Sequence, residues 1–130
     1  MMLKAVKKSE KPHNHEECMS MLAPVQDALY VLNGKWKLPV IIALREGHKR
    51  FGEIQKQVKG IAAKVLSHEL KELELNGFVE RMVYNTTPVT VEYIITNYTD
   101  TLDEVIMALR DWGLAHRNKI RAQMKERKAV

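Results

Sequence analysis

The chain has 130 residues, of which 45% are hydrophobic, 28% are charged and only 6% are aromatic. This size and composition fit one soluble domain with a largely aliphatic core. No apolar run approaches the roughly 20 residues of a membrane helix, and the N-terminal residues lack the apolar segment of a secretory signal. Cys18 is the only cysteine. These features exclude an intrachain disulfide and favour a reducing cytoplasm.

Positive charge is concentrated in the middle of the chain. The formal net charge is +5, and residues 35–71 hold nine lysines and arginines against three glutamates. A basic surface confined to one segment is typical of proteins that bind a polyanion. An ordinary solvated helix face has the same composition, so charge alone leaves both interpretations open.

The first half of the chain predicts a flexible arm and then four helices. Residues 1–20 are polar and aperiodic, as expected of an arm. Pro24 suits the first turn of a helix, which then continues with apolar residues at intervals of three and four. Each later helix ends near a glycine, a common helix stop. Those helices are predicted over residues 36–45, 51–58 and 62–76.

The second half predicts a β-hairpin and a long final helix. Residues 89–96 alternate and are rich in β-branched side chains, residues 78–84 have strand composition, and the intervening segment contains Pro88. An apolar row at helical spacing predicts a helix over about 97–128. The expected fold is mainly α with a small β-hairpin wing. It is a winged helix-turn-helix over residues 21–130, with the long C-terminal helix serving dimerisation.

One face of the helix predicted at 62–76 carries the side chains that DNA recognition requires. It lies opposite the apolar stripe of Leu66, Leu70 and Leu73. Lysine can contact guanine or phosphate, and serine and histidine can meet donors or acceptors on base edges. Nearby glutamates limit the width of this face. The predicted base-contacting residues are Ala63, Lys64, Ser67, His68 and Lys71.

Several short motifs resemble one known family. They include Gly34-Lys35-Trp36-Lys37, Arg50-Phe51-Gly52-Glu53-Ile54, Asn76-Gly77-Phe78-Val79-Glu80-Arg81 and Trp112-Gly113. In this order and spacing, the chain from residue 24 to 113 resembles the HxlR-type winged helix-turn-helix regulators of bacteria. The resemblance implies a homodimer, a recognition helix at about 62–76 and a wing at about 84–90. Family members act mostly as repressors and some as activators.

The chain departs from the family pattern at two places. Members that sense oxidants usually carry cysteine directly before the proline of the first helix, where this chain has Ala23-Pro24. The recognition helix opens with Ala62-Ala63, where a serine or threonine cap is frequent. Its absence is expected to weaken the helix start by about 1 kcal/mol.

Further contacts are expected with the DNA backbone and with a second subunit. Trp36 could stack on the backbone, although an aromatic at a helix start is more often a core anchor. Cations and wing residues are expected to contact phosphate or the minor groove: Lys35, Lys37, Lys49, Arg50, Tyr84, Asn85, Thr86 and Thr90. Apolar residues of the first and last helices are expected to form the dimer seam: Val25, Leu29, Tyr98, Leu102, Val105, Ile106, Leu109 and Trp112.

Cys18 lies among side chains that could bind a metal, namely His13, His15, Glu16 and Glu17. This cluster does not match a structural zinc pattern, so we expect neither a metal nor a cofactor. The two glutamates disfavour the thiolate that a redox sensor needs. In a dimer, however, two Cys18 side chains could still form a disulfide.

The motifs that the chain lacks help to choose between competing functions. The chain lacks a phosphate-binding loop, a metalloprotease helix motif, a nucleophile elbow and a dinucleotide-binding turn, so we expect no enzyme. Two alternatives stay open: a winged-helix adaptor for other proteins, and a redox- or metal-responsive regulator that uses Cys18. The expected partners are double-stranded operator DNA and a second copy of the chain. A small-molecule effector of unknown identity also stays open.

Overall fold

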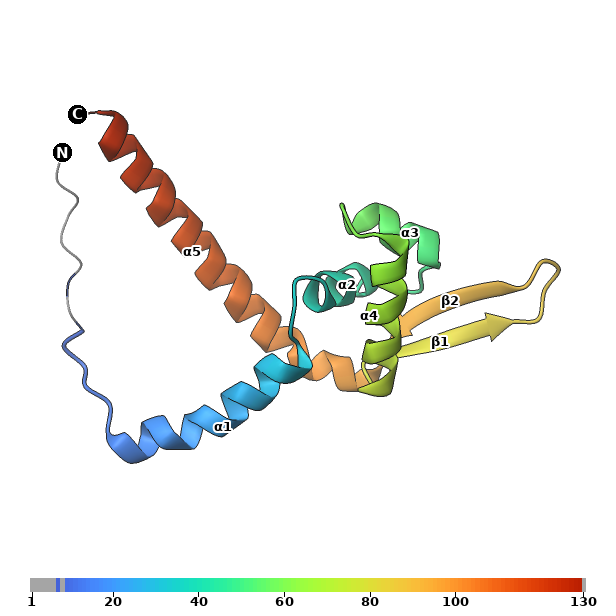
Figure 1. Ribbon diagram of the computed structural model, residues 1–130, viewed down its shortest axis with the longest axis horizontal. Helices are drawn as coiled ribbons and strands as arrows, with labels where there is room; N and C mark the ends of the chain where they lie inside the picture. The colour runs from blue at the N-terminus through green and yellow to red at the C-terminus, as the bar shows by residue number, and fades with distance from the viewer. Residues whose placement is uncertain (1–6, 8, 130) are drawn as a thin grey trace. The chain divides into compact units, whose positions relative to one another are not determined.

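The computed structural model describes residue 7 and residues 9–129. Its elements, in chain order, are α1 (His15–Val31), α2 (Lys37–Leu44), α3 (Phe51–Gln57), α4 (Ala63–Leu75), β1 (Val79–Tyr84), β2 (Thr90–Ile95), the 3₁₀ helix η1 (Asn97–Leu102) and α5 (Asp103–Lys128) (Figure 1). One compact unit is formed by residues 26–103, and the described residues on either side belong to a second. The predicted fold class is confirmed. No described helix is both long and apolar enough to cross a membrane.

The core of the 26–103 unit is aliphatic, as its composition predicts. Helices α2, α3 and α4 each turn one apolar stripe inward, and side chains of all three are almost completely buried. Phe78 and Val79 extend this core to the start of β1. The largest fully buried hydrophobic side chains are Val40, Ile41, Leu44, Ile54, Leu66, Leu70 and Leu73.

Helix α4 ends in a glycine motif that directs the chain into the hairpin. Gly77 has a φ of 80°, a left-handed conformation that favours glycine. The Phe78 amide donates to the Leu73 carbonyl at 2.9 Å, and the Gly77 amide donates to the Glu74 carbonyl at 3.0 Å. This pattern satisfies carbonyls at the helix end. It also fixes the point at which the chain leaves α4 and enters β1.

Strands β1 and β2 form the predicted wing. They pair antiparallel, from Val79 opposite Ile95 to Tyr84 opposite Thr90. Tyr93 also exchanges backbone hydrogen bonds of 3.0 and 2.8 Å with Lys49, just before α3. The wing is therefore tied to the helix-turn-helix on both sides: β1 continues from α4, and β2 pairs with the segment that leads into α3.

The predicted start of the first helix was wrong. Helix α1 begins at His15, so Pro24 lies inside it and residues 15–20 are helical rather than part of a flexible arm. The Asn14 side chain accepts a hydrogen bond from the Glu17 amide at 2.9 Å. Asparagine is among the best N-terminal caps, and acidic residues in the first turn favour a helix start. Most of the residues predicted as arm before position 9 lie outside the described part of the chain.

The last helix occupies nearly the predicted range. Its first part, Asn97–Leu102, is the 3₁₀ helix η1, and α5 continues from Asp103 to Lys128. Thr99 is buried and its hydroxyl donates to the Phe78 carbonyl at 2.5 Å. This bond anchors η1 beside the point where β1 begins.

Candidate nucleic-acid interface

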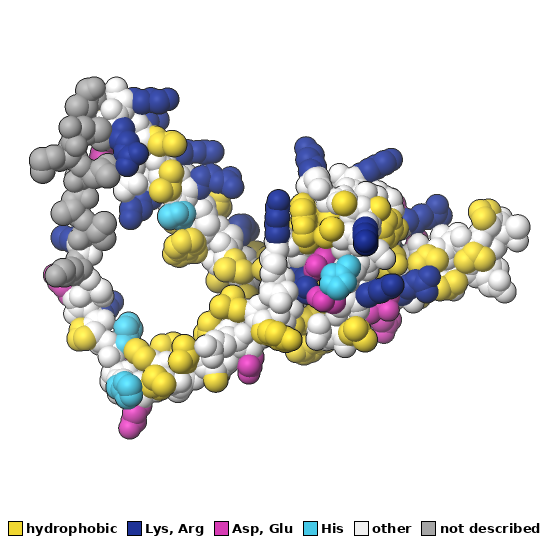
Figure 2. All heavy atoms as spheres, in the orientation of Figure 1, with side chains coloured by type: hydrophobic (Ala, Val, Ile, Leu, Met, Phe, Trp, Pro, Cys, Tyr) yellow, Lys and Arg dark blue, Asp and Glu magenta, His cyan; other side chains and the backbone are white. Residues whose placement is uncertain are grey.

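The predicted recognition face is exposed on α4. Ala63, Lys64, His68 and Lys71 are exposed and Ser67 is half-buried, while the leucine stripe on the opposite side of the helix is buried. In the described part of the chain, no ion pair involves Lys64 or Lys71. Their charges are therefore available to an external anion. Figure 2 shows Lys and Arg side chains distributed over the surface of α2 to α4 and the start of the hairpin.

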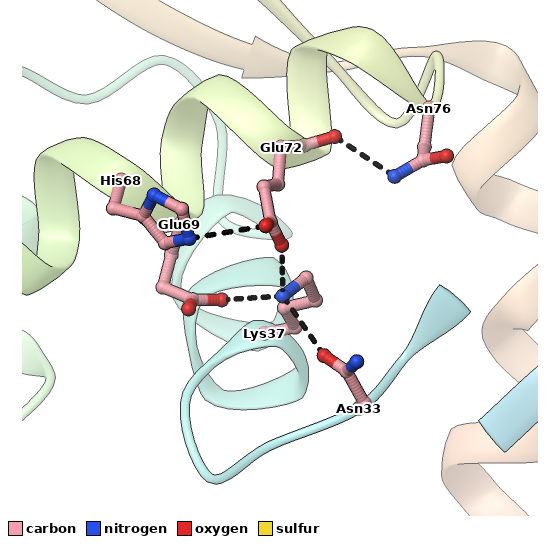
Figure 3. Close-up of polar contacts among 6 residues, drawn as sticks. All are labelled: Asn33, Lys37, His68, Glu69, Glu72 and Asn76. Atoms are coloured by element: carbon pink, nitrogen blue, oxygen red, sulfur yellow. Dashed lines mark hydrogen bonds and ion pairs between the residues drawn. The ribbon is translucent and has the colours of Figure 1, made fainter. Parts of the chain in front are cut away.

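Lys37 does not belong to this surface, which corrects its predicted contact with phosphate. Its side chain is only 4% exposed, and its ammonium lies 2.9 Å from Glu69 and 2.5 Å from Glu72 (Figure 3). It also donates to the Asn33 side chain at 3.2 Å. Lys37 thus holds the start of α2 against the middle of α4 and cannot contact DNA.

The same cluster reduces an electrostatic obstacle on the predicted recognition helix. Free carboxylates at Glu69 and Glu72 would repel phosphate, but Lys37 lies against both and offsets one of their two negative charges. Burial alone would lower the pKa of Lys37, yet the hydrogen bonds and charges of Glu72 and Glu69 outweigh it and hold this pKa above its ordinary value. The hydrogen bond from Lys37 lowers the pKa of Glu72, and His68 lowers it further. Lys37 and Glu72 are consequently both charged near neutral pH.

His68 connects this cluster to the exposed face. Its Nε2 lies 3.0 Å from Glu72, while 66% of its side chain stays exposed. His68, Glu69 and Glu72 bring three potential metal ligands within 4.8 Å of one another. The Lys37 ammonium already lies against both carboxylates, so these residues fit an internal ion cluster better than a metal centre.

The other residues predicted to contact phosphate differ in how available their charged groups are. Lys49 is 16% exposed in its side chain and pairs with Glu46 at 2.9 Å. That contact lowers the pKa of Glu46, and it leaves Lys49 less available than an unpaired lysine. Arg50 is exposed at the start of α3. The ammonium of exposed Lys35 lies over the Trp36 ring, 4.7 Å from its centroid.

Most predicted wing residues lie at the tip of the hairpin, where the chain turns. Asn85 and Thr86 are exposed, while Tyr84 and Thr90 are half-buried. The Thr86 hydroxyl lies 3.1 Å from that of Thr90 and donates to the Pro88 carbonyl at 2.7 Å. These contacts brace the turn and leave the Asn85 side chain without a hydrogen-bond partner among those that the structure gives.

Arg81 is a candidate phosphate contact that the sequence did not single out. A cavity of about 410 Å³ lies between α4 and the hairpin. Its lining brings Lys71 and Ser67 of α4 together with Arg81 of β1 and Tyr93 of β2. Glu74 contributes the one acidic side chain. Two cations and two hydroxyls around one hollow match the groups that commonly contact a DNA backbone.

The predicted dimer residues are exposed with one clear exception. Val25, Leu29, Tyr98, Leu109 and Trp112 are each more than half exposed, an unusual state for such large apolar side chains. Val105 is 45% exposed and Leu102 is half-buried. Ile106 is 9% exposed, buried within its own chain, which removes it from the predicted seam. Cys18 is an exposed free thiol on α1.

Comparisons with known proteins agree on one class of protein. A model of the HxlR-like helix-turn-helix family matches residues 31–121. The HTH-type transcriptional regulator YdeP of Bacillus subtilis is 38% identical over 106 residues, covering 82% of this chain and 83% of YdeP. Among solved structures, the redox regulator HypR in its reduced form aligns at 34% identity with a TM-score of 0.71, over 77% of this chain and 99% of HypR. The reduced form of the B. subtilis regulator YodB aligns at 37% identity with a TM-score of 0.64, over 71% of this chain and 90% of YodB.

Proposed function

The chain belongs to the HxlR-like helix-turn-helix family of transcriptional regulators, and from this premise we propose that it is a sequence-specific repressor that acts as a homodimer. Members of this family are regulators rather than enzymes. The observation that carries the proposal is the exposed face of α4, where unpaired lysines flank Ser67 and His68. In a helix-turn-helix, this face of the second helix enters the major groove.

Contacts with DNA would divide between base edges and phosphates. Ser67, His68 and Lys71 lie on one face of α4 and would contact bases, while Lys35, Arg50 and Arg81 lie on other elements and would contact the backbone. Ala63 and Lys64 lie at the start of α4, closest to the turn from α3. The wing residues Tyr84, Asn85, Thr86 and Thr90 would contact the minor groove or the adjacent backbone, with Lys49 contributing after release from Glu46.

A homodimer is supported by the apolar surface of α1, η1 and α5. Leu109 and Trp112 recur at helical spacing with Val105 on α5, and each is substantially exposed. Burying such a row against a second copy would be favourable because it removes apolar area from water. A two-fold dimer would also present two recognition helices, each to one half of a palindromic operator. A bound dimer that covers a promoter would repress transcription.

Binding to the gene's own upstream DNA tests this function. We expect wild-type protein to shift that fragment in the presence of excess random DNA. The double variant Lys64→Ala/Lys71→Ala should weaken binding by about 10-fold or more, because phosphate and base contacts are both lost. The matched control Lys119→Ala/Lys125→Ala removes two exposed charges from α5 and should bind almost normally. No shift at low salt would favour the alternative, a winged-helix adaptor for other proteins.

Response to oxidants is a second candidate function. HypR is a redox regulator, and YodB has also been crystallised after diamide treatment. In this chain Cys18 lies on α1, is exposed and is therefore open to a soluble oxidant. A disulfide between the Cys18 residues of two subunits would couple oxidation to the dimer.

A further inference from the structure

A groove between α2 and α3 differs in character from the rest of the basic surface. It is a cavity of about 430 Å³ whose apolar wall is formed by Trp36, Pro39, Ile42, Ala43 and Val58. Ile42 is 48% exposed, although it lies on an apolar helix beside fully buried residues. This exposed apolar wall is not used by the proposed DNA contacts.

The rim of the groove is positively charged. Lys35 and Lys59 line it together with the amide side chain of Gln57, and none of the lining residues is acidic. Three other cavities of the same unit each include a carboxylate, from Glu72, Asp27 or Glu74. The Lys35 ammonium is held at the aromatic wall by its contact with the Trp36 ring. An apolar groove with two cations at its edge is complementary to an amphipathic anion.

We propose that this groove binds a small aromatic carboxylate. The aromatic ring would lie against Trp36 and Ile42, where it removes exposed apolar area from water. The carboxylate would be attracted by Lys35 and Lys59, and a neutral ligand of the same shape would lack this attraction. The proposal thus specifies both parts of the ligand: a planar ring and one negative charge.

The position of the groove links such a ligand to DNA binding. Gly60 has a φ of 88°, and a Cβ at this residue would lie 3.8 Å from the Trp36 ring. This turn immediately precedes α4, whose N-cap is Ala62. A bound carboxylate would also offset the charge of Lys35, a proposed phosphate contact. Occupancy is therefore expected to weaken DNA binding, a step that rests on the proposed function.

The test of binding uses sodium 2-naphthoate and protein without DNA. The chain has two tryptophans, so its ¹⁵N-labelled spectrum carries two indole signals, which the Trp36→Phe variant assigns. At constant ionic strength, we expect the Trp36 signal to shift saturably with a Kd between about 0.1 and 1 mM, as befits a small ligand. The neutral analogue 2-naphthamide should bind at least about five-fold more weakly.

Two matched lysine variants test which cation attracts the carboxylate of the ligand. Lys59→Gln should raise the Kd of naphthoate by about five-fold, near the upper end for an exposed ion pair. Lys56→Gln removes an exposed lysine from α3 that does not line the groove, and it should leave the Kd unchanged. No saturable shift of Trp36 by about 5 mM, equal affinity for naphthamide, or an unchanged Kd in Lys59→Gln would each overturn the proposal.

A second measurement distinguishes a failure of the ligand site from a failure of the proposed DNA-binding function. Operator affinity is measured with and without saturating naphthoate, and we expect a loss of at least about three-fold with the ligand. An unchanged affinity, despite a shifted Trp36 signal, would overturn the regulatory step alone. Failure to bind operator without any ligand would count against the proposed function, while the Trp36 titration would still decide the binding site.

Discussion

His68 lies on the exposed face of α4 and yet already contacts the carboxylate of Glu72 at 3.0 Å. This contact orients the imidazole in the absence of DNA. We expect His68→Ala to change which operator sequences are preferred, by about 1–3 kcal/mol at the base pair that it contacts. Affinities for a set of single-base operator variants measure this change. Equal losses on operator and random DNA would refute a base contact.

Arg50 provides the contrast, because it lies at the start of α3 and is expected to contact phosphate. Arg50→Ala should weaken binding to operator and random DNA alike and reduce the salt dependence of the affinity by about one charge for each subunit. Titrations at several salt concentrations measure both quantities. A change in the preferred sequence would place Arg50 at a base instead.

A variant of Cys18 tests the alternative that the protein responds to oxidants. The family resemblance places the usual sensing cysteine directly before the first-helix proline, and here that position is Ala23. We therefore expect diamide to leave operator affinity within about two-fold in both wild-type protein and Cys18→Ser. Binding assays before and after oxidation, with and without reductant, decide the matter. A large, reductant-reversible loss in the wild type alone would establish Cys18 as a sensor.

Lys37 joins the helices α2 and α4. Replacing it by methionine keeps the apolar stem but leaves the two glutamates without their cation. Because the Lys37 side chain is only 4% exposed, we expect Lys37→Met to lower the free energy of unfolding by about 1–3 kcal/mol. The control Lys56→Met, on an exposed side chain, should change it by less than about 0.5 kcal/mol. Urea titration measures both, and equal effects would contradict the structural role of Lys37.

The pH dependence of this effect follows from the two pKa shifts. The lowered pKa of Glu72 means that its stabilisation is present above its ordinary value of 4.5 and is lost as the pH falls through the lowered value. The raised pKa of Lys37 means that its stabilisation persists to pH values above 10.5. Stability curves of wild type and Lys37→Met should therefore differ most between about pH 5 and 10 and converge in acid. A constant difference down to pH 3 would contradict this assignment.

The elements themselves were largely predictable because their signals are local. Apolar spacing and terminal glycines located α2, α3 and α4 to within about two residues, and β-branched alternation located the wing. The start of α1 is harder to predict, because Pro24 is typical of a first turn while the Asn14 side chain accepts a hydrogen bond from the Glu17 amide and begins the helix earlier. A proline is tolerated within a helix when packing or a strong start compensates, and spacing alone does not show this.

The site was less predictable because its features come from contacts between elements. Nothing local distinguishes buried Lys37 from exposed Lys35, which lies two residues away in the same motif. Arg81 joins Lys71 only because the hairpin folds against α4, so strand alternation could at most suggest that Arg81 is exposed. The apolar groove likewise exists only when α2 and α3 are packed together.

The exposed apolar row of α5 predicts that the protein associates with itself. Val105→Asp/Leu109→Asp places two charges in that row and should yield a monomer or an aggregate, since an unpaired charge in a buried seam is strongly unfavourable. Light scattering at micromolar concentration measures the mass. The control Lys119→Gln/Lys125→Gln changes the net charge by the same two units at exposed positions of the same helix. A wild-type protein that is monomeric under these conditions would refute the homodimer.

Methylation interference on the operator tests most directly whether α4 enters the major groove. Methyl groups are placed on guanine N7, which faces that groove, and the fragments that still bind are separated and sequenced. We predict interference at guanines in two half-sites about one helical turn apart, and the loss of one position in each half-site with Lys71→Ala. Binding that is indifferent to N7 methylation, or a pattern unchanged in Lys71→Ala, would contradict the assignment of α4 as the recognition helix.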